Sequence, residues 1–148
     1  MAEQAALDGE AAPPLHILAG PRLAEAAPAS AVLRLFHHHV YEYGRGVRAL
    51  FLMTLSRGEL ALVAAKLRNQ GIEHFVQEVS PSKVNLFFGR PAFVAVARAF
   101  VTRPLNALSP EEDFMLGTLL GYDREQQCRR FLARSGRGMP EEAALAAE

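Results

Sequence analysis

The segment 47-VRALFLMTLSRGELALVAAKLRNQG-71 sets the order of the fold, because two different hydrophobic patterns follow one another in it. Residues 47–55 form a nearly continuous apolar run, which is typical of a strand buried on both faces and therefore of a central strand. Residues 59–71 instead repeat apolar side chains every three or four positions, which predicts an amphipathic helix that ends at Gly71. The segment thus predicts a strand followed directly by a helix.

The next residues predict two strands and another helix. IEHFVQEV (72–79) and VNLFFG (84–89) are short apolar runs joined by the turn residues SPSK, which predicts a β-hairpin. Pro91 then opens a helix over 91–101, at a position where a proline needs no backbone N–H. Strand, helix, strand, strand, helix is the order of a split βαβ layer arrangement.

A helix is also predicted upstream of the first strand. Apolar side chains from Val32 to Tyr43 recur every three or four residues. Ser30 precedes them at the position of an N-cap, and Gly44 follows them as a stop signal. This helix carries the three adjacent histidines of the chain.

Two further helices are predicted near the C-terminus. Ser109 and Glu112 have the spacing of a capping box, so a helix should begin at Pro110. Asp123 caps a final helix, whose apolar stripe includes Cys128. The complete prediction is an α+β fold, with a three-stranded sheet in a βαββα-like core packed by about five helices.

The chain has one foldable core and two polar ends. It contains 148 residues with 16 basic and 16 acidic side chains, and this neutrality argues against a dedicated nucleic-acid binder. Residues 1–28 and 135–148 offer little apolar surface, so we expect a flexible arm and a flexible tail around a single domain at 29–134. That domain holds 14 basic and 9 acidic groups, a formal charge of +5.

The single cysteine of the chain bears on its compartment. One cysteine excludes an intrachain disulfide and fits the reducing cytosol. No apolar run approaches the roughly 20 residues that span a bilayer, and the N-terminus lacks a signal-peptide pattern. We therefore expect a soluble cytoplasmic protein that binds neither membranes nor nucleic acid.

The histidines in FHHHVYEYG (36–44) raise the question of a metal site. Successive side chains on a helix are turned by about 100°, so the three imidazoles do not converge on one ion. His38 and Glu42 do share a face and form half a site, to which His74 in the hairpin would be the only further imidazole. The alternative is that the histidines border the buried stripe and are satisfied by backbone or carboxylate groups.

A small anion is a second candidate ligand. Gly89 and Arg90 stand between a strand and a helix, where free N–H groups and a guanidinium can meet an anion. The alternative is a tight strand-to-helix turn that requires Gly89.

A reactive thiol is the third chemical possibility. Cys128 is expected on the apolar face of the last helix beside Phe131, where buried thiols are usually inert packing groups. The chain contains no complete catalytic constellation. We therefore expect a protein that is not an enzyme and needs no cofactor.

Arginines in the last helix form the strongest surface feature of the sequence. Such a cluster steers an acidic partner toward its end of the molecule, although a solvated face is the alternative. RNA would require exposed aromatic side chains, and Phe131 is expected to be buried, so an acidic protein is the preferred partner. The arginines are Arg124, Arg129, Arg130 and Arg134.

Three motifs of the chain are HHxVYEYxxG (37–46), NLFFG (85–89) and EEDFMLGTLLGYDREQQC (111–128). They resemble those of a family of small bacterial proteins known only as a domain of unknown function. The resemblance covers about residues 33–132 and implies three strands, five helices and a homodimer. It also implies genes encoded near flavodoxins, which are acidic proteins, and no catalytic residues. Where the family pattern ends in Arg-Tyr, this chain has Arg130-Phe131.

Three functions are compatible with these features. The preferred one is a non-enzymatic homodimeric interaction or regulatory module, in which Gly117 and Gly121 allow close association and the arginines bind an acidic protein such as a flavodoxin. The second is a sensor of a metal or small anion, at the histidine or glycine sites described above. The third is a thiol-based redox protein that uses Cys128.

Overall fold

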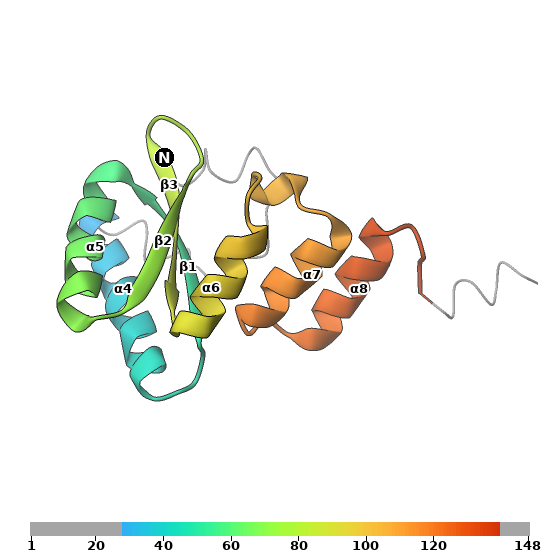
Figure 1. Cartoon of the computed structure of the whole chain (residues 1–148), viewed down its shortest axis with the longest axis horizontal. Coiled ribbons are helices and arrows are strands. Elements are labelled where there is room, and N and C mark those ends of the chain that lie inside the picture. Colours follow the sequence, from blue (N-terminus) through green and yellow to red (C-terminus); the bar gives the residue numbers. More distant parts are fainter. Residues whose placement is uncertain (1–27, 140–148) are drawn as a thin grey trace, which may run out of the picture.

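The structure is a computed structural model and describes residues 28–139. Within this range it confirms the predicted α+β class, with three strands and five helices (Figure 1). Most of the predicted flexible arm and tail lies outside the described residues. The elements are α4 (Pro28–Gly44), β1 (Leu50–Ser56), α5 (Arg57–Gln70), β2 (Glu73–Glu78), β3 (Lys83–Gly89), α6 (Pro91–Phe100), a 3₁₀ turn (Leu105–Ala107), α7 (Pro110–Leu119) and α8 (Arg124–Arg134).

The three strands form one antiparallel sheet in the order β1-β3-β2. Because β1 and β2 both run antiparallel to β3 and are joined by α5, they form a split βαβ unit. The prediction that the first strand is central was wrong. β3 is the central strand, and its residues from Val84 to Gly89 are all buried.

Helices cover both faces of this sheet, as Figure 1 shows. On one face, α4 and α5 enclose a core that includes Phe36, Phe51 and Phe88. On the other face, α6 and α7 pack on Leu50 and Phe87. Because both faces are covered, an edge strand such as β1 also needs apolar side chains on both sides, which explains its central-like sequence. None of the helices in the described range is long and apolar enough to cross a membrane.

Most of the predicted helix ends are confirmed. The Ser109 capping box at α7 is formed in both directions, and Asp123 accepts a hydrogen bond from the backbone of α8. Gly71 ends α5 in the left-handed conformation, with a φ of 68°. Ser30 is not an N-cap, because α4 begins earlier, at Pro28, and a proline fits the first turn of a helix.

Candidate functional site

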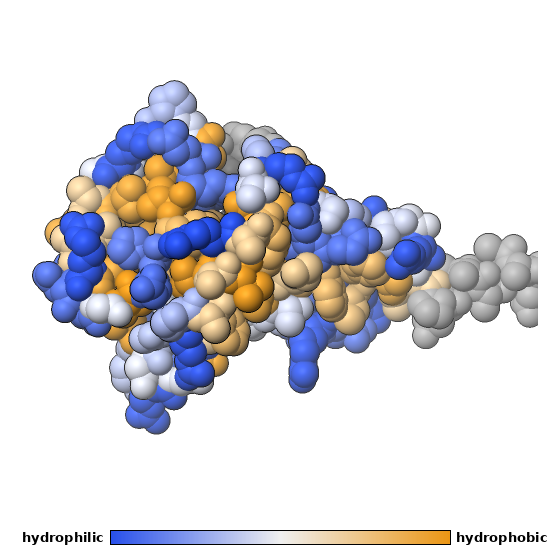
Figure 2. Space-filling view, in the orientation of Figure 1, coloured by the Kyte–Doolittle hydropathy of each residue, from blue (hydrophilic) through white to orange (hydrophobic). Residues whose placement is uncertain are grey.

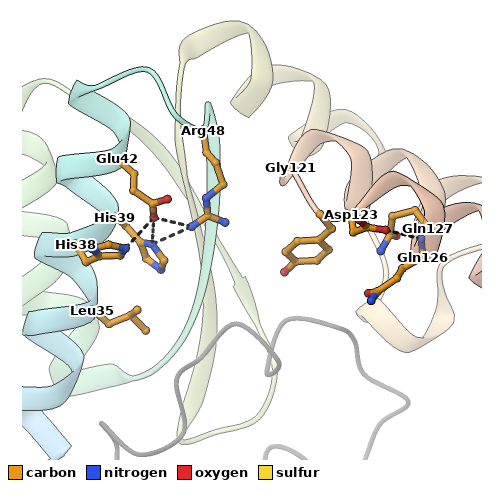
Figure 3. Close-up of a pocket in the computed structure, with 10 residues that line it drawn as sticks. Leu35, His38, His39, Glu42, Arg48, Gly121, Asp123, Gln126 and Gln127 are labelled. Carbon is orange, nitrogen blue, oxygen red and sulfur yellow. Dashed lines mark hydrogen bonds and ion pairs between the residues drawn. The ribbon is translucent and has the colours of Figure 1, made fainter.

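A polar cleft lies between α4 and the turn that joins α7 to α8 (Figure 3). Its volume of about 410 Å³ falls in the range of small-molecule pockets. One wall comes from α4, the other comes from the start of α8, and an arginine that precedes β1 lies between them. The lining residues are Leu35, His38, His39, Glu42, Arg48, Gly121, Tyr122, Asp123, Gln126 and Gln127.

Arg48 is the centre of the hydrogen bonds in this cleft. Its Nη2 donates to Glu42 Oε1 and to His39 Nδ1, both at 3.1 Å. Its Nη1 donates to the Leu120 carbonyl oxygen at 3.4 Å, and its guanidinium lies 4.6 Å from the centre of the Phe51 ring. Arg48 therefore joins α4, β1 and the end of α7.

His39 is an uncharged group at neutral pH. Since a guanidinium only donates, the bond from Arg48 to Nδ1 places the imidazole proton on Nε2. Burial, and then the charge of Arg48, lower the pKa of His39 from 6.5 to about 4, although Glu42 opposes this shift. The α4 wall therefore carries a neutral imidazole with one N–H donor.

Glu42 is the ionised member of the same cluster. Burial acts to raise the pKa of Glu42, but the hydrogen bond and the charge of Arg48 outweigh burial and hold the pKa below its ordinary value. The carboxylate and the guanidinium thus neutralise each other within the cleft.

The structure brings together two of the three predicted metal ligands. His38 Nε2 lies 3.4 Å from Glu42 Oε1. His74 lies on β2, with its Nδ1 3.3 Å from the carbonyl oxygen of Ile72. In residues 28–139 no group of three or more His, Cys, Asp or Glu side chains is placed to hold a metal ion.

The α8 wall is built around Gln127. Gln127 is only 4% exposed and packs against Gly117 of α7, where a Cβ atom would lie 2.0 Å from its Oε1. Asp123 Oδ1 accepts a hydrogen bond from Gln126 N at 2.9 Å. Burial raises the pKa of Tyr122, against the opposing charge of Arg48, so its side chain is a neutral phenol.

Gly117 and Gly121, which were predicted to allow close association of two copies, contact side chains of the same chain. Gly117 makes room for Gln127. Gly121 follows α7 with a φ of 78°, and a Cβ there would lie 3.2 Å from Arg48 Cδ. These glycines therefore shape the cleft.

The four arginines predicted to bind a partner lie on α8, where three of them are paired within the chain. Arg130 and Arg134 both contact Asp113, at 2.6 and 3.2 Å, and Arg129 pairs with a glutamate one turn away. Arg124 is exposed and has no partner among the described residues. Residues 110–134 contain five acidic and four basic side chains, a formal charge of −1, so the positive charge of the domain lies elsewhere. Partner binding at these arginines stays a prediction.

Exposed cations gather on the outer face of α4. Tyr41 is 61% exposed there, with the Arg45 guanidinium 5.9 Å from its ring centre. Arg90 extends this surface, because its Nη2 lies 3.5 Å from where a Cβ of Gly46 would be. The only acidic residue from 28 to 58 is Glu42, which is already paired with an arginine. We call this surface the α4 stripe, formed by Arg34, His37, His38, Tyr41, Arg45 and Arg90.

The predicted anion site is a close contact between strands. Gly89 has a φ of 156°, and a Cβ there would lie 2.0 Å from the carbonyl oxygen of Ala49. The same oxygen accepts a hydrogen bond from Arg90 N at 2.9 Å, so this N–H is not free to bind an anion. These contacts support the alternative of a tight turn that requires glycine.

Cys128 is exposed, so the prediction that it packs in the core was wrong. The cause is the orientation of α8, which turns Gln127 toward Gly117 and its neighbour Cys128 outward. Phe131 is half-buried and lies edge-on to Phe114, with ring centres 5.8 Å apart. A half-buried ring was also not expected.

Comparisons with known proteins identify the family. Comparison with curated proteins gives no match. The family model described as "Protein of unknown function (DUF2023)" matches residues 34–134, a range that includes every residue lining the cleft. The chain therefore belongs to the DUF2023 family.

Proposed function

We propose that this protein is a non-enzymatic interaction module that binds an acidic protein through the α4 stripe. The observation that carries the proposal is the group of exposed arginines Arg34, Arg45 and Arg90 on the surface that carries the exposed ring of Tyr41. The only acidic residue from 28 to 58 is Glu42, which is already paired with Arg48. Clustered cations accelerate encounter with an acidic surface, and tyrosine and arginine are the side chains that most often dominate binding energy. Flavodoxins are acidic, so a flavodoxin is the first partner to test.

The side-chain contacts support binding over catalysis. Among the described residues, no serine, threonine or cysteine side chain is hydrogen-bonded to a histidine or a carboxylate. Cys128 is exposed but makes no such contact. A nucleophile without a base to activate it is a poor catalyst.

Charge reversal on the α4 stripe is expected to weaken binding of a flavodoxin at least about tenfold, and to reduce the salt dependence of the affinity. The variant is Arg34→Glu with Arg45→Glu and Arg90→Glu. The affinity can be measured by isothermal titration calorimetry at two salt concentrations.

A matched reversal on α8 separates the two candidate surfaces. Arg124→Glu with Arg129→Glu changes two exposed arginines of α8 that do not contact Asp113, and it leaves the contacts of Asp113 intact. We expect this variant to bind nearly as the original protein does. If it loses binding while the stripe variant keeps it, the partner binds at α8. If the original protein shows no binding, a flavodoxin is the wrong partner.

We also propose that two copies associate through the outer face of α6. This helix is apolar on both sides: Val94 and Ala97 face the core, while Ala95 and Val96 are exposed. Figure 2 shows apolar surface over α6. Because an exposed apolar patch on a helix often marks a site of association, a second copy of the same small-residue face is the occupant that we propose.

Val96→Glu is expected to convert the dimer to a monomer, since it would place two carboxylates in an apolar interface. Val96 is 45% exposed in the single chain, so the substitution should not disturb the core. Light scattering after size-exclusion chromatography measures the mass. Leu62→Glu, at a similarly exposed leucine of α5, is the control and should remain dimeric. A monomeric original protein, or a dimeric Val96→Glu, contradicts this proposal.

A further inference from the structure

The outer edge of β2 is open to another strand. β2 is an edge strand of the sheet, and no other strand in residues 28–139 pairs with its outer side (Figure 1). Two apolar side chains at this edge are accessible, because Val76 is 40% exposed and Val79 is 51% exposed. An edge strand with accessible backbone groups and apolar side chains is a template for pairing with another chain.

Alternate residues of β2 direct their backbone groups to this open edge. In an antiparallel pair, every second residue of a strand bonds to its neighbour. The N–H of Val79 donates to the carbonyl oxygen of Lys83 at 3.1 Å, on the side of β3, so the odd-numbered residues of β2 also bond to β3. The backbone groups of His74, Val76 and Glu78 therefore point outward.

The outward backbone groups are little used within the chain. The N–H and the carbonyl oxygen of Val76 make no hydrogen bond with another described residue. The carbonyl oxygen of His74 accepts a hydrogen bond from Arg98 Nη2 at 3.0 Å, as expected for a group that points away from β3. A carbonyl oxygen has two lone pairs, so this one can still accept a second hydrogen bond.

The side chains on one face of this edge are complementary to themselves. His74, Val76 and Glu78 alternate along the strand and therefore share a face. When a second β2 lies antiparallel with Val76 opposite Val76, each His74 lies opposite the Glu78 of the other copy. Cβ atoms of opposite side chains are then about 4.5–5.5 Å apart, where a protonated imidazole and a carboxylate attract each other.

Other registers are less favourable. A shift of two residues moves either His74 or Glu78 beyond the end of the other β2, so one outward residue loses its partner. A shift of four residues places two histidines or two glutamates opposite each other, and like charges in that position are destabilising. The sequence of β2 therefore selects one symmetric register with a second copy.

Both polar side chains of this register are accessible to a second copy. The side chain of Glu78 is 75% exposed, and although its Oε1 lies 3.2 Å from Arg57 Nη2, a carboxylate can accept at both oxygens. His74 Nδ1 lies 3.3 Å from the carbonyl oxygen of Ile72. With Nδ1 as the donor in that contact, Nε2 is left for the glutamate of the second copy.

We infer that β2 pairs antiparallel with the β2 of a second copy, about a twofold axis at Val76, so that the two sheets become continuous. One short edge buries far less than the roughly 1,000 Å² of a stable interface, so the contact is weak and forms only in concentrated protein. It lies on a different element from the α6 face and does not rest on the α6 proposal.

Analytical ultracentrifugation of the full chain tests this inference. The runs are made at pH 6, where histidine side chains are partly protonated, and at protein concentrations from about 5 µM to about 1 mM. The mean mass is expected to rise with concentration, with a Kd for the β2 contact below about 1 mM.

Val76→Pro tests the backbone pairing. Proline removes the outward N–H at the twofold axis, and it is tolerated in an edge strand where that N–H faces solvent, so the bonds to β3 remain. The β2 contact should weaken at least about tenfold. Val76→Thr is the matched control, because threonine has a similar shape and keeps the N–H, and it should associate within about threefold of the original protein.

An exchange of charges tests the register. His74→Glu places two glutamates opposite each other on both sides of the axis, and the β2 contact should weaken at least about tenfold. Adding Glu78→Lys restores opposite charges and should recover most of the lost affinity. This pair of variants tests the inference even when Val76→Pro fails to fold.

Three results would overturn the inference. They are a mass that stays constant over the whole concentration range, a Val76→Pro protein that associates as the original does, and a double variant that associates no better than His74→Glu alone. Val96→Glu should lower the mass of dilute protein but keep its rise with concentration. Failure of the β2 contact and failure of the α6 contact can therefore be told apart.

Discussion

Gly89→Ala is expected to lose at least about 4 kcal/mol of unfolding free energy, which is most of the stability of a domain of this size. The φ of 156° at Gly89 belongs to a region that is open almost only to glycine. The added Cβ would lie 2.0 Å from the carbonyl oxygen of Ala49 and 2.9 Å from its carbonyl carbon. Because that oxygen accepts the hydrogen bond of Arg90 N, the two strands cannot separate without losing the end of the sheet.

Urea unfolding followed by circular dichroism measures this loss, and Gly58→Ala supplies the matched control. Gly58 lies in the first turn of α5 with a negative φ and no atom within 4 Å of a new Cβ. Alanine there should be neutral or stabilise the protein by up to about 1 kcal/mol. A Gly89→Ala protein with an unfolding midpoint close to that of the original would show that the strands can adjust, contrary to this expectation.

The parts of the fold that could be predicted from the sequence are those with local causes. The capping box at Ser109 and the C-cap at Gly71 each depend on a few neighbouring residues, and both are present. Strand order has no local cause. The apolar run of β1 indicates that helices cover both faces of the sheet. It does not distinguish a central strand from an edge strand, and β1 is an edge strand.

The candidate site was harder to predict because its contacts cross the chain. Arg48 and its acceptor Leu120 are 72 residues apart. The position of Arg48 did indicate such a contact. A charged side chain at the start of an apolar run normally needs a partner when it is buried. No such signal existed for Gln127, whose burial depends on the space that Gly117 leaves on another helix. The same packing relation turned Cys128 outward.

Lowering the pH from 7 to 5 is expected to remove about 2 kcal/mol of unfolding free energy through His39 alone. The folded pKa of about 4 lies below the unfolded value of 6.5, so the unfolded chain takes up the proton first. The stabilisation is therefore complete above pH 6.5 and is lost as the pH falls from 6.5 toward 4. Two causes lower the pKa of His39 in the folded protein. The first is burial against Phe51, with ring centres 5.0 Å apart, and the second is the charge of Arg48.

His39→Gln tests this assignment because glutamine does not titrate, yet its amide oxygen can still accept the hydrogen bond from Arg48. In this variant, urea unfolding should show that the unfolding free energies at pH 7 and pH 5 differ by less than about 0.5 kcal/mol. His37→Gln, at the exposed histidine two residues earlier, should keep the original difference. Glu42 does not contribute to the difference between pH 7 and pH 5, because its pKa lies below 4.5. The stability that its carboxylate contributes is lost only at more acidic pH. If His39→Gln keeps the full difference, another group is protonated on unfolding, and the α4 wall of the cleft is not held by a neutral imidazole.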